Sequence, residues 1–244
     1  MGLPRVRIVG PGRAGASFAG ALASSGWSVA EPIGRADDPR HAGVDVDLVL
    51  ICTPDAAIAS VAAAIEPCEA VIAHVAGSLG LAALAPHDRC AAIHPLMSLP
   101  DADIGAQRLM AGGWFAIAGD PVAAQLVASL GGRTMHVADA DRARYHAAAC
   151  VASNHLVVLF GQVERLARSI DVPLEAYLDL GRASLDNVAR LGAIGALTGP
   201  AARGDDATIE AHLAALPADE VPLYRALVDE ARRLAADADR HHHR

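Results

Sequence analysis

A glycine-rich stretch near the start of the chain, Gly-Pro-Gly-Arg-Ala-Gly at residues 10–15, constrains the fold more than any other feature. It follows the apolar run 6–9, and residues 16–23 after it have the apolar spacing of a helix. A strand, a tight glycine turn and a helix bring backbone N–H groups and a helix N-terminus against a diphosphate. The stretch therefore predicts a dinucleotide site. The alternative is a structural turn, since a chain with 22 glycines can produce the pattern by chance.

Strand and helix patterns alternate from this stretch to residue 137. Further β-branched and aliphatic runs predict strands at 27–33, 46–52, 70–75, 91–95, 114–119 and 134–137. Alternating β and α segments wind into a parallel sheet that is covered by helices on both faces. The chain is therefore predicted to begin with a doubly wound α/β domain.

Strand patterns stop after residue 139, and helical spacing takes over. A long helix is predicted at 141–169, followed by helices at about 174–197, 208–216 and 221–238. We expect two domains, a dinucleotide-binding domain at residues 1–138 and a helical domain at residues 139–244. The apolar stripe of the first long helix needs a partner surface, which favours a homodimer.

Composition and charge argue against several classes of protein. The chain has 244 residues, of which 53% are hydrophobic and 20% charged, as in a well-buried globular protein. A formal charge of −8 without a basic run argues against a nucleic-acid partner. No uninterrupted apolar stretch approaches the roughly 18 residues of a membrane span, and the start lacks the apolar core of a signal peptide. We therefore expect a cytoplasmic protein without a membrane partner.

The cysteine, histidine and lysine content limits the reactions that the chain can catalyse. Four cysteines without Cys-x-x-Cys spacing predict reduced thiols, and no metal site is expected, the histidine run at 241–243 included. The sequence has no lysine, so all 20 basic residues are arginines and Schiff-base chemistry is excluded. Histidine, which ordinarily titrates near neutral pH, must then carry much of any proton transfer.

Arg35 follows the second predicted strand, where dinucleotide-binding domains meet the adenosine ribose. A carboxylate there favours NAD, and an arginine accommodates the extra phosphate of NADP. Arg35 favours NADP, while the nearby Asp37 and Asp38 keep NAD open. Thr53, at the end of a strand, either lines the cofactor or caps the next helix. The predicted cofactor-binding residues are Gly10, Gly12, Arg13, Ala14, Gly15, Arg35, Thr53, Pro54, Gly77 and Ser78.

A polar face on the long helix is the predicted catalytic surface. His146, Cys150, Ser153 and Asn154 fall within roughly 100° of one another at 3.6 residues per turn. We expect His146 to act as the acid and Asn154 and Ser153 to orient a substrate oxygen. The alternative is a hydrogen-bonded seam between helices.

Two other places supply predicted substrate-binding residues. His94 ends the strand at 91–95 and either faces the substrate or makes a structural hydrogen bond. The loop at 197–209 is dense in turn formers and carries Arg203 and Asp205. Arg203 can hold a substrate carboxylate bidentately, and the alternative is an Arg203–Asp205 ion pair that stabilises the loop.

Six segments carry a resemblance to a known family: GPGRAGASFAGAL, LVLICTPDAAI, HVAGSLG, HPLMSLP, YHAAACVASNHLVVLF and LTGPAARGDDATIEAHLAAL. On them, and most specifically on the last two, the chain resembles the Rossmann-like proteins with a domain of unknown function, DUF2520. The layout is more distantly similar to pyrroline-5-carboxylate reductase, F420-dependent NADP reductase, and the β-hydroxyacid dehydrogenase and ketopantoate reductase group. The resemblance implies a Rossmann domain followed by an all-α domain like the C-terminal domain of 6-phosphogluconate dehydrogenase.

The resemblance also implies an NAD(P)-dependent oxidoreductase that acts on a small, carboxylate-bearing keto acid or imine, with ketopantoate as one candidate. In the β-hydroxyacid enzymes a lysine and, one turn later, an asparagine act on the helix after the Rossmann domain. Asn154 matches that pattern, but Cys150 stands in the place of the lysine. An NADP-binding sensor or scaffold without hydride transfer, and an F420-dependent NADP reductase, are the alternative functions.

Overall fold

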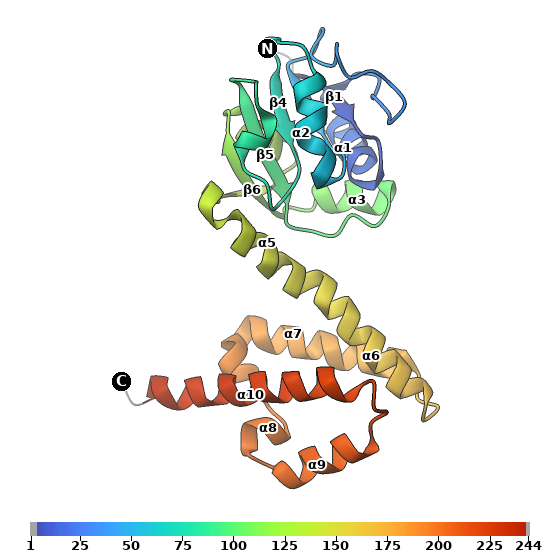
Figure 1. Ribbon diagram of the computed structural model, residues 1–244, viewed down its shortest axis with the longest axis vertical. Helices are drawn as coiled ribbons and strands as arrows, with labels where there is room; N and C mark the ends of the chain where they lie inside the picture. Colours follow the sequence, from blue (N-terminus) through green and yellow to red (C-terminus); the bar gives the residue numbers. More distant parts are fainter. Residues whose placement is uncertain (1–3, 243–244) are drawn as a thin grey trace. The chain divides into compact units, whose positions relative to one another are not determined.

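The structure, a computed structural model, describes the backbone of residues 4–242 and the side chains of residues 4–237. The chain divides into two compact units, residues 1–155 and 156–244. Strands and helices alternate in the first unit (Figure 1). Its elements are β1 (Arg5–Val9), α1 (Arg13–Ser24), β2 (Ser28–Val29), β3 (Leu48–Ile51), α2 (Asp55–Ala64), β4 (Val71–His74), η1 (Leu81–Leu84), β5 (Cys90–Pro95), α3 (Ala102–Leu109), β6 (Trp114–Gly119), α4 (Val122–Ser129), β7 (Arg133–His136), η2 (Asp139–Asp141), α5 (Arg142–Cys150) and η3 (Val151–His155).

Seven strands form one sheet in the order β2-β1-β3-β4-β5-β6-β7. β1 pairs in parallel with both β2 and β3, so the strand order reverses at β1. Doubly wound sheets bind ligands at such a reversal, outside the carboxyl ends of the strands. The strand predicted at 27–33 is reduced to Ser28–Val29 and a single bridge between Val9 and Ile33, because Pro32 has no N–H to donate to a ladder.

Two strands, β6 and β7, run opposite to the predicted parallel sheet. β6 runs antiparallel to β5, and β7 is parallel to β6. After β5 the chain enters α3, which packs beside α1 (Figure 1), where Ser17 Oγ donates to Asp101 O at 3.1 Å. The chain re-enters the sheet with Leu96 N donating to Trp114 O at 2.9 Å. It therefore returns from the carboxyl edge that it left, which makes β6 antiparallel.

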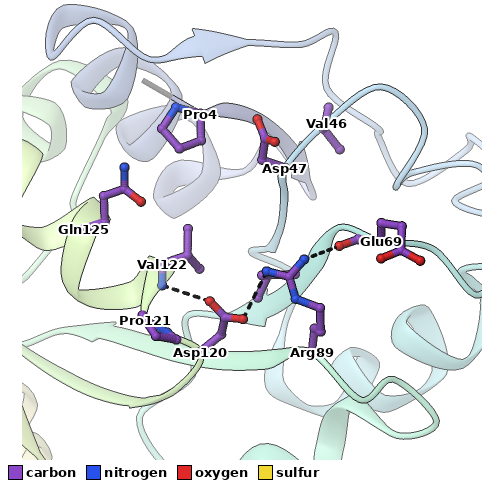
Figure 2. A pocket seen from close by; sticks show the side chains of 10 residues that line it. Pro4, Val46, Asp47, Glu69, Arg89, Asp120, Pro121, Val122 and Gln125 are labelled. Carbon is purple, nitrogen blue, oxygen red and sulfur yellow. Dashed lines mark hydrogen bonds and ion pairs between the residues drawn. The ribbon is translucent and has the colours of Figure 1, made fainter. Parts of the chain in front are cut away.

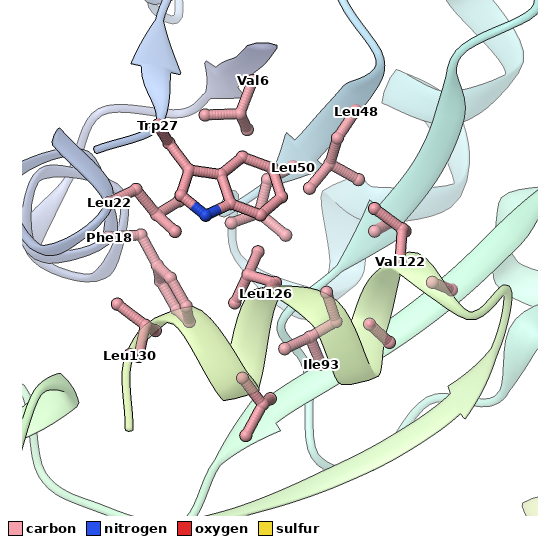
Figure 3. Close-up of a cluster of buried hydrophobic side chains, with 14 of the residues drawn as sticks. Val6, Phe18, Leu22, Trp27, Leu48, Leu50, Ile93, Val122, Leu126 and Leu130 are labelled. Carbon is pink, nitrogen blue, oxygen red and sulfur yellow. The ribbon is translucent and has the colours of Figure 1, made fainter. Parts of the chain in front are cut away.

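Each face of the sheet has its own buried cluster of apolar side chains. On one face Phe18 and Leu22 of α1 and Leu126 of α4 pack over the strands (Figure 3). Trp27 joins this cluster, and its Nε1 donates to Ser129 Oγ at 2.8 Å. On the other face α2 and η1 cover the strands. All residues of β3 and β4 are buried, so the strand ends that carry the candidate site belong to a rigid scaffold.

The described residues of the second unit form helices: α6 (Leu156–Arg168), α7 (Leu174–Ala196), α8 (Pro200–Arg203), α9 (Asp206–Ala215) and α10 (Val221–His242). Gln162 Nε2 donates to Glu220 O at 3.0 Å and Arg165 pairs with the Glu220 carboxylate, which ties α6 to the start of α10. The predicted fold class, an α/β Rossmann domain followed by a helical domain, is confirmed. The histidine run at 241–243, where no metal site is expected, extends past residue 242, so its last part lies outside the described residues.

The two compact units divide at residues 155 and 156, whereas the strands end at β7. The helical residues between these points belong to the first unit because they contact its strands and loops. Asp139 Oδ2 accepts from Leu81 N at 3.2 Å, and Tyr145 Oη lies 2.7 Å from His94 Nδ1. The start of the long helix is thus part of the scaffold of the first unit.

Among residues 4–242, one helix is long and apolar enough to cross a membrane by length and composition alone. It spans residues 139–168 with a mean hydropathy of 1.2, and 6% of its most apolar window is buried. Its apolar run is interrupted by His146, Ser153, Asn154 and His155, which is why the sequence predicts no span there. A single such helix is weak evidence for a membrane protein, because helices of soluble proteins pass the same test.

Candidate active site

The glycine-rich stretch forms the turn between β1 and α1. Gly10 has a φ of 89°, and a Cβ there would lie 2.9 Å from Thr53 Cγ2. A Cβ on Gly15 would lie 2.3 Å from Gly10 O, so a larger residue would push α1 away from the strand. Gly12, by contrast, faces open space, with nothing within 4 Å of a Cβ. The turn therefore presents bare backbone at the start of α1.

A cavity of about 440 Å³ opens beside this turn, between the ends of β1 and β3. Because the strand order reverses at β1, the cavity occupies the expected ligand position of a doubly wound sheet. α1 begins at Arg13 and Ala14 without a side-chain cap, so its first N–H groups have no partner within the helix. Predicted cofactor residues that line the cavity are Gly10, Gly12, Arg35, Thr53 and Pro54.

Thr53 does not cap α2, contrary to one of its two predicted roles. The N-cap is Pro54, which makes no side-chain hydrogen bond to the helix. Thr53 Oγ1 is instead buried without a hydrogen-bond partner among the described residues. Because an unsatisfied buried hydroxyl costs about 1–3 kcal/mol, we expect a ligand or a water to satisfy it.

The two carboxylates that follow the second strand are hydrogen-bonded within their loop, whereas Arg35 is not. Asp37 Oδ2 accepts from Gly34 N at 2.7 Å, and Asp38 Oδ1 accepts from Arg40 N at 2.9 Å. Arg35 is exposed at the cavity and makes no hydrogen bond or ion pair with the described part of the chain. The two carboxylates stabilise their own loop, while the Arg35 guanidinium is available to a ligand.

A second cavity, of about 550 Å³, lies at the carboxyl end of β5 and along α5 and η3. His94, Tyr145 and His146 meet there. His94 Nδ1 lies 2.7 Å from Tyr145 Oη, and the His94 and His146 rings meet edge to face with centroids 5.9 Å apart. Three further predicted or neighbouring polar residues line it: Cys150, Ser153 and Asn154. Its described lining has no Asp, Glu or Arg, so acid–base chemistry would depend on imidazole, phenol, thiol and hydroxyl groups.

The end of β4 approaches the same rings. A Cβ on Gly77 would lie 2.6 Å from His146 Cδ2 and 2.9 Å from His94 Nε2, so only a glycine leaves room for both histidines. Ser78 Oγ donates to Asp55 Oδ2 at 2.8 Å, which ties this loop to the first turn of α2. The structure thus brings predicted cofactor and substrate residues to one sheet edge of the first unit.

The surroundings of His94 keep its imidazole neutral. Burial, followed by the nearby His146 and Arg142, lowers the pKa of His94 to about 4, against the opposing effect of Asp55. Burial raises the pKa of Tyr145, and the Arg142 charge acts in the opposite direction. At neutral pH the pair therefore consists of a neutral imidazole and a protonated phenol.

Arg142 and His74 supply unsatisfied polar atoms beneath this pair. Arg142 is 1% exposed, and its Nε donates to Asp139 Oδ1 at 3.4 Å, but its Nη1 and Nη2 have no partner among the described residues. His74 Nδ1 is likewise buried and unpaired, and burial lowers the pKa of His74. A buried positive charge with few hydrogen bonds makes this edge of the sheet electropositive.

The long helix changes geometry where the predicted catalytic face lies. η3, residues Val151–His155, is a π-helical turn that includes Ser153 and Asn154. Single π turns interrupt α-helices frequently at functional sites. The wider turn alters the angular spacing from which the face was predicted, yet His146, Ser153 and Asn154 line the same cavity.

Arg203 and Asp205 lie in the second unit. Asp205 caps α9, with its carboxylate accepting from Thr208 N at 3.1 Å and from Thr208 Oγ1 at 2.7 Å, and these bonds lower the pKa of Asp205. Arg203 is exposed and forms no ion pair with Asp205 or with another described residue. The loop is therefore held by the Asp205 cap and not by the alternative ion pair.

A third cavity, of about 760 Å³, lies at the opposite, amino edge of the sheet. Arg89 lines it and donates to Glu69 O at 2.6 Å and to Asp120 Oδ2 at 3.3 Å (Figure 2). These charged groups satisfy one another, and none of the predicted site residues lines the cavity. We therefore place the candidate site at the carboxyl edge.

One family model matches part of the chain. Residues 115–231 match the family described as "Domain of unknown function (DUF2520)". The match covers just under half of the chain. The predicted resemblance is thus confirmed, and the DUF2520 segment begins in β6 and ends in α10. No curated protein sequence gives a significant match to the chain.

Solved structures similar to this chain include Rossmann-fold oxidoreductases. The Bacteroides fragilis protein BF3122, provisionally described as an NADP oxidoreductase, has a TM-score of 0.78 and 22% identity over 95% of this chain and 98% of its own. Plasmodium falciparum pyrroline carboxylate reductase, with NADP bound, has a TM-score of 0.63 and 11% identity over 96% and 99%. The Aspergillus terreus reductive aminase, in complex with NADPH and ethyl levulinate, has a TM-score of 0.68 and 17% identity over 97% and 99%. At these identities the likeness establishes the fold.

Sequence reasoning missed two residues of the candidate site, Tyr145 and Arg142. Tyr145 directly precedes His146 and is one of only 3 tyrosines. Its position beside a predicted site residue could have indicated it, but helical spacing does not place it on the predicted polar face. Arg142 carries no such signal, since nothing in an arginine-rich sequence marks one guanidinium as buried.

Proposed function

We propose that this protein is an NADP-dependent oxidoreductase that reduces a small carbonyl or imine compound. One observation carries the proposal: a bare glycine-rich helix N-terminus and a cavity lined by proton-donating side chains occupy the same sheet edge of the first unit. The likeness to NADP- and NADPH-bound reductases of the same fold supports it.

The residues at the first cavity fit a dinucleotide. Gly12 leaves open space at the start of α1, where a Cβ would otherwise stand between the helix N–H groups and a phosphate. The unpaired Thr53 Oγ1 offers a further hydrogen bond beside it. When bound, the nicotinamide would supply the hydride. The chain itself would bind the phosphates, orient the substrate and provide a proton, for which His146 is the sequence-predicted donor.

The local hydrogen bonds support NADP over NAD. Asp37 and Asp38, the carboxylates that could accept from a ribose hydroxyl, are engaged with backbone N–H groups of their own loop. Arg35 is unpaired at the cavity and can bind a 2′-phosphate.

A titration of the full chain with NADPH and NADH, followed by nucleotide fluorescence, tests the cofactor. We expect NADPH to bind about tenfold tighter or better, a difference of about 1.4 kcal/mol. Arg35→Gln should remove this preference, while Arg40→Gln, on the same loop but engaged with Asp38 and Glu66, should retain it. Failure of the wild-type protein to bind either nucleotide would overturn the proposal.

The substrate is proposed to be a small keto acid or imine, with ketopantoate as the first candidate. The described lining of the second cavity has no Asp, Glu or Arg, so the carboxylate part of this proposal rests on the sequence prediction for Arg203, which is exposed and forms no ion pair with a described residue. NADPH oxidation with ketopantoate and with the neutral ketone ethyl levulinate separates these cases. If the protein oxidises NADPH with ketopantoate but not with ethyl levulinate, the carboxylate proposal is supported. Binding of NADPH without oxidation by any ketone or imine would favour the sensor or scaffold.

We also propose a homodimer through the second unit. α7 has 23 residues and none of them is buried, and Leu180, Leu185 and Leu191 are 63%, 54% and 61% exposed. Exposed leucines along this helix leave apolar surface that a second copy would cover. Light scattering should give a mass of about twice 25.0 kDa, and Leu185→Glu with Leu191→Glu should reduce it to that of a monomer.

A further inference from the structure

We propose that Tyr145 donates the proton to the substrate in the proposed reduction, with His94 as the residue that positions its hydroxyl. The inference rests on the proposed function and replaces His146, the donor that the sequence predicts, by its neighbour on α5. His94 Nδ1 lies 2.7 Å from Tyr145 Oη, with the ring planes at 88°, and both side chains line the 550 Å³ cavity.

The contact between these two residues is a tertiary one. His94 stands at the end of β5 and Tyr145 on α5, 51 residues later. The hydrogen bond fixes the phenol oxygen at the cavity wall, whereas His146 makes no hydrogen bond with the described residues and meets His94 only through its ring edge. A proton donor whose position is fixed before the substrate binds loses less entropy in the reaction.

The charges around the pair suit proton donation by the phenol. The titratable and charged groups that face His94 are His146 and Arg142 on α5, Asp55 on α2 and His74 on β4, and with burial they leave its imidazole neutral. A neutral imidazole has one N–H group. If that proton is on Nδ1, it is donated to Tyr145 Oη, and the phenol proton is free to point into the cavity.

The proton and electron balance of the step is complete. When bound, NADPH would supply the hydride for the new C–H bond at the carbonyl carbon, and the C=O π pair would move to the oxygen. That oxygen takes the Tyr145 Oη proton, so one O–H bond forms and one breaks. The resulting phenolate is stabilised by the His94 Nδ1–H bond and by the buried Arg142 charge, and it regains a proton from water.

The second unit supplies a matched control pair. His212 Nδ1 lies 2.6 Å from Tyr224 Oη, and the rings meet edge to face at 83°, but this pair lines none of the described cavities. Tyr145→Phe and Tyr224→Phe therefore each remove a tyrosine hydroxyl that contacts a histidine. The two pairs differ in that only the first one lines a described cavity.

The kinetic experiment measures single-turnover NADPH oxidation by full-length variants with ketopantoate, or with ethyl levulinate if the wild-type protein rejects ketopantoate. Tyr145→Phe should slow the step about 10²- to 10³-fold, as loss of a general acid does, while its NADPH affinity stays within about twofold. Tyr224→Phe should keep the wild-type rate. Equal rates for Tyr145→Phe and wild type, or a large loss only in His146→Gln, would overturn the inference while leaving the proposed function intact.

An independent readout needs no cofactor. In ¹⁵N-labelled protein, the nitrogen shifts of the imidazoles report which nitrogen of His94 carries the proton. We expect the Nδ1–H tautomer in the wild-type protein and a change of tautomer in Tyr145→Phe. A proton on Nε2 in the wild-type protein would overturn the inference even if the protein were an active NADPH reductase. Absence of NADPH binding would instead refute the proposed function, whatever the tautomer.

Discussion

Two tyrosine–histidine pairs with nearly the same geometry lie in different units of this protein. In the first unit His94 Nδ1 and Tyr145 Oη are 2.7 Å apart, and in the second unit His212 Nδ1 and Tyr224 Oη are 2.6 Å apart. The first pair joins residues 51 positions apart beside a cavity, and the second joins residues 12 positions apart on two neighbouring helices at the surface. Hydrogen-bond geometry alone therefore does not make a functional site. Burial, a neighbouring charge and open space beside the pair do.

The largest expected effect on stability comes from filling the space beside the first pair. A Cβ on Gly77 would stand 2.6 Å from His146 Cδ2 and 2.9 Å from His94 Nε2, so both rings must move. We expect Gly77→Ala to lower the free energy of unfolding by about 3 kcal/mol, as overpacking does, and to abolish turnover. Urea unfolding measures the change.

Gly20→Ala is the matched control, because its Cβ would be 3.4 Å from Ala106 Cβ on an exposed part of α1. It should stabilise the helix by about 0.5–1 kcal/mol. If Gly77→Ala were as stable as the wild-type protein, the two histidines would not be as tightly held as the first pair requires.

The next effect is the acid sensitivity that His94 confers. Its pKa is lowered to about 4 in the folded chain, against about 6.5 in the unfolded chain, so only the unfolded chain gains this proton as the pH falls. The stabilising contribution is present above about pH 6.5 and is lost as the pH falls toward 4, by about 2 kcal/mol after allowance for solvent screening. Unfolding of wild type and His94→Asn at pH 7.5 and 4.5 isolates it. Equal losses in both proteins would contradict the assignment.

Local sequence patterns predicted most of the fold. The glycine-rich stretch, the buried runs of β3 and β4 and the helix spacing after residue 139 depend on near neighbours in the chain, and each is found in the structure. The direction of β6 could not be predicted in this way. It depends on α3 packing against α1, a contact between segments far apart in the sequence.

The candidate site likewise contains residues that local patterns predict and residues that only tertiary contacts bring in. His94 at a strand end and His146 on a helix face line one cavity, because strand ends and helix faces follow from local patterns. The hydrogen bond between Tyr145 and His94 and the burial of Arg142 depend on how α5 lies against the sheet, which periodicity does not specify. The π turn at Val151–His155 could not be predicted either, because the angular spacing of side chains assumes a regular α-helix.

A smaller effect is expected at the buried charge beneath the first pair. Arg142 is 1% exposed with two unpaired nitrogens, so its desolvation is poorly compensated. We expect Arg142→Met to raise the free energy of unfolding by about 1 kcal/mol while slowing turnover, because the phenolate of Tyr145 loses the positive charge that favours it.

Arg144→Met is the control, since Arg144 is 87% exposed and pairs with Asp141 at the surface. It should change stability by less than about 0.5 kcal/mol and leave the rate unchanged. A loss of stability in Arg142→Met would mean that the guanidinium has hydrogen-bond partners in solution, such as bound water or an anion.

The smallest effect is expected at the second pair, and it decides how the two pairs differ. Tyr224→Phe removes a hydrogen bond at an exposed position, where water replaces the lost partner of His212, so we expect a cost of about 0.5 kcal/mol. Tyr145→Phe leaves His94 Nδ1 without a partner in a half-buried place, where the cost is about 1–3 kcal/mol. Thermal unfolding of both variants gives the two values side by side. If Tyr224→Phe cost as much as Tyr145→Phe, burial would not distinguish the pairs, and the case for the first as a site would depend on its cavity alone.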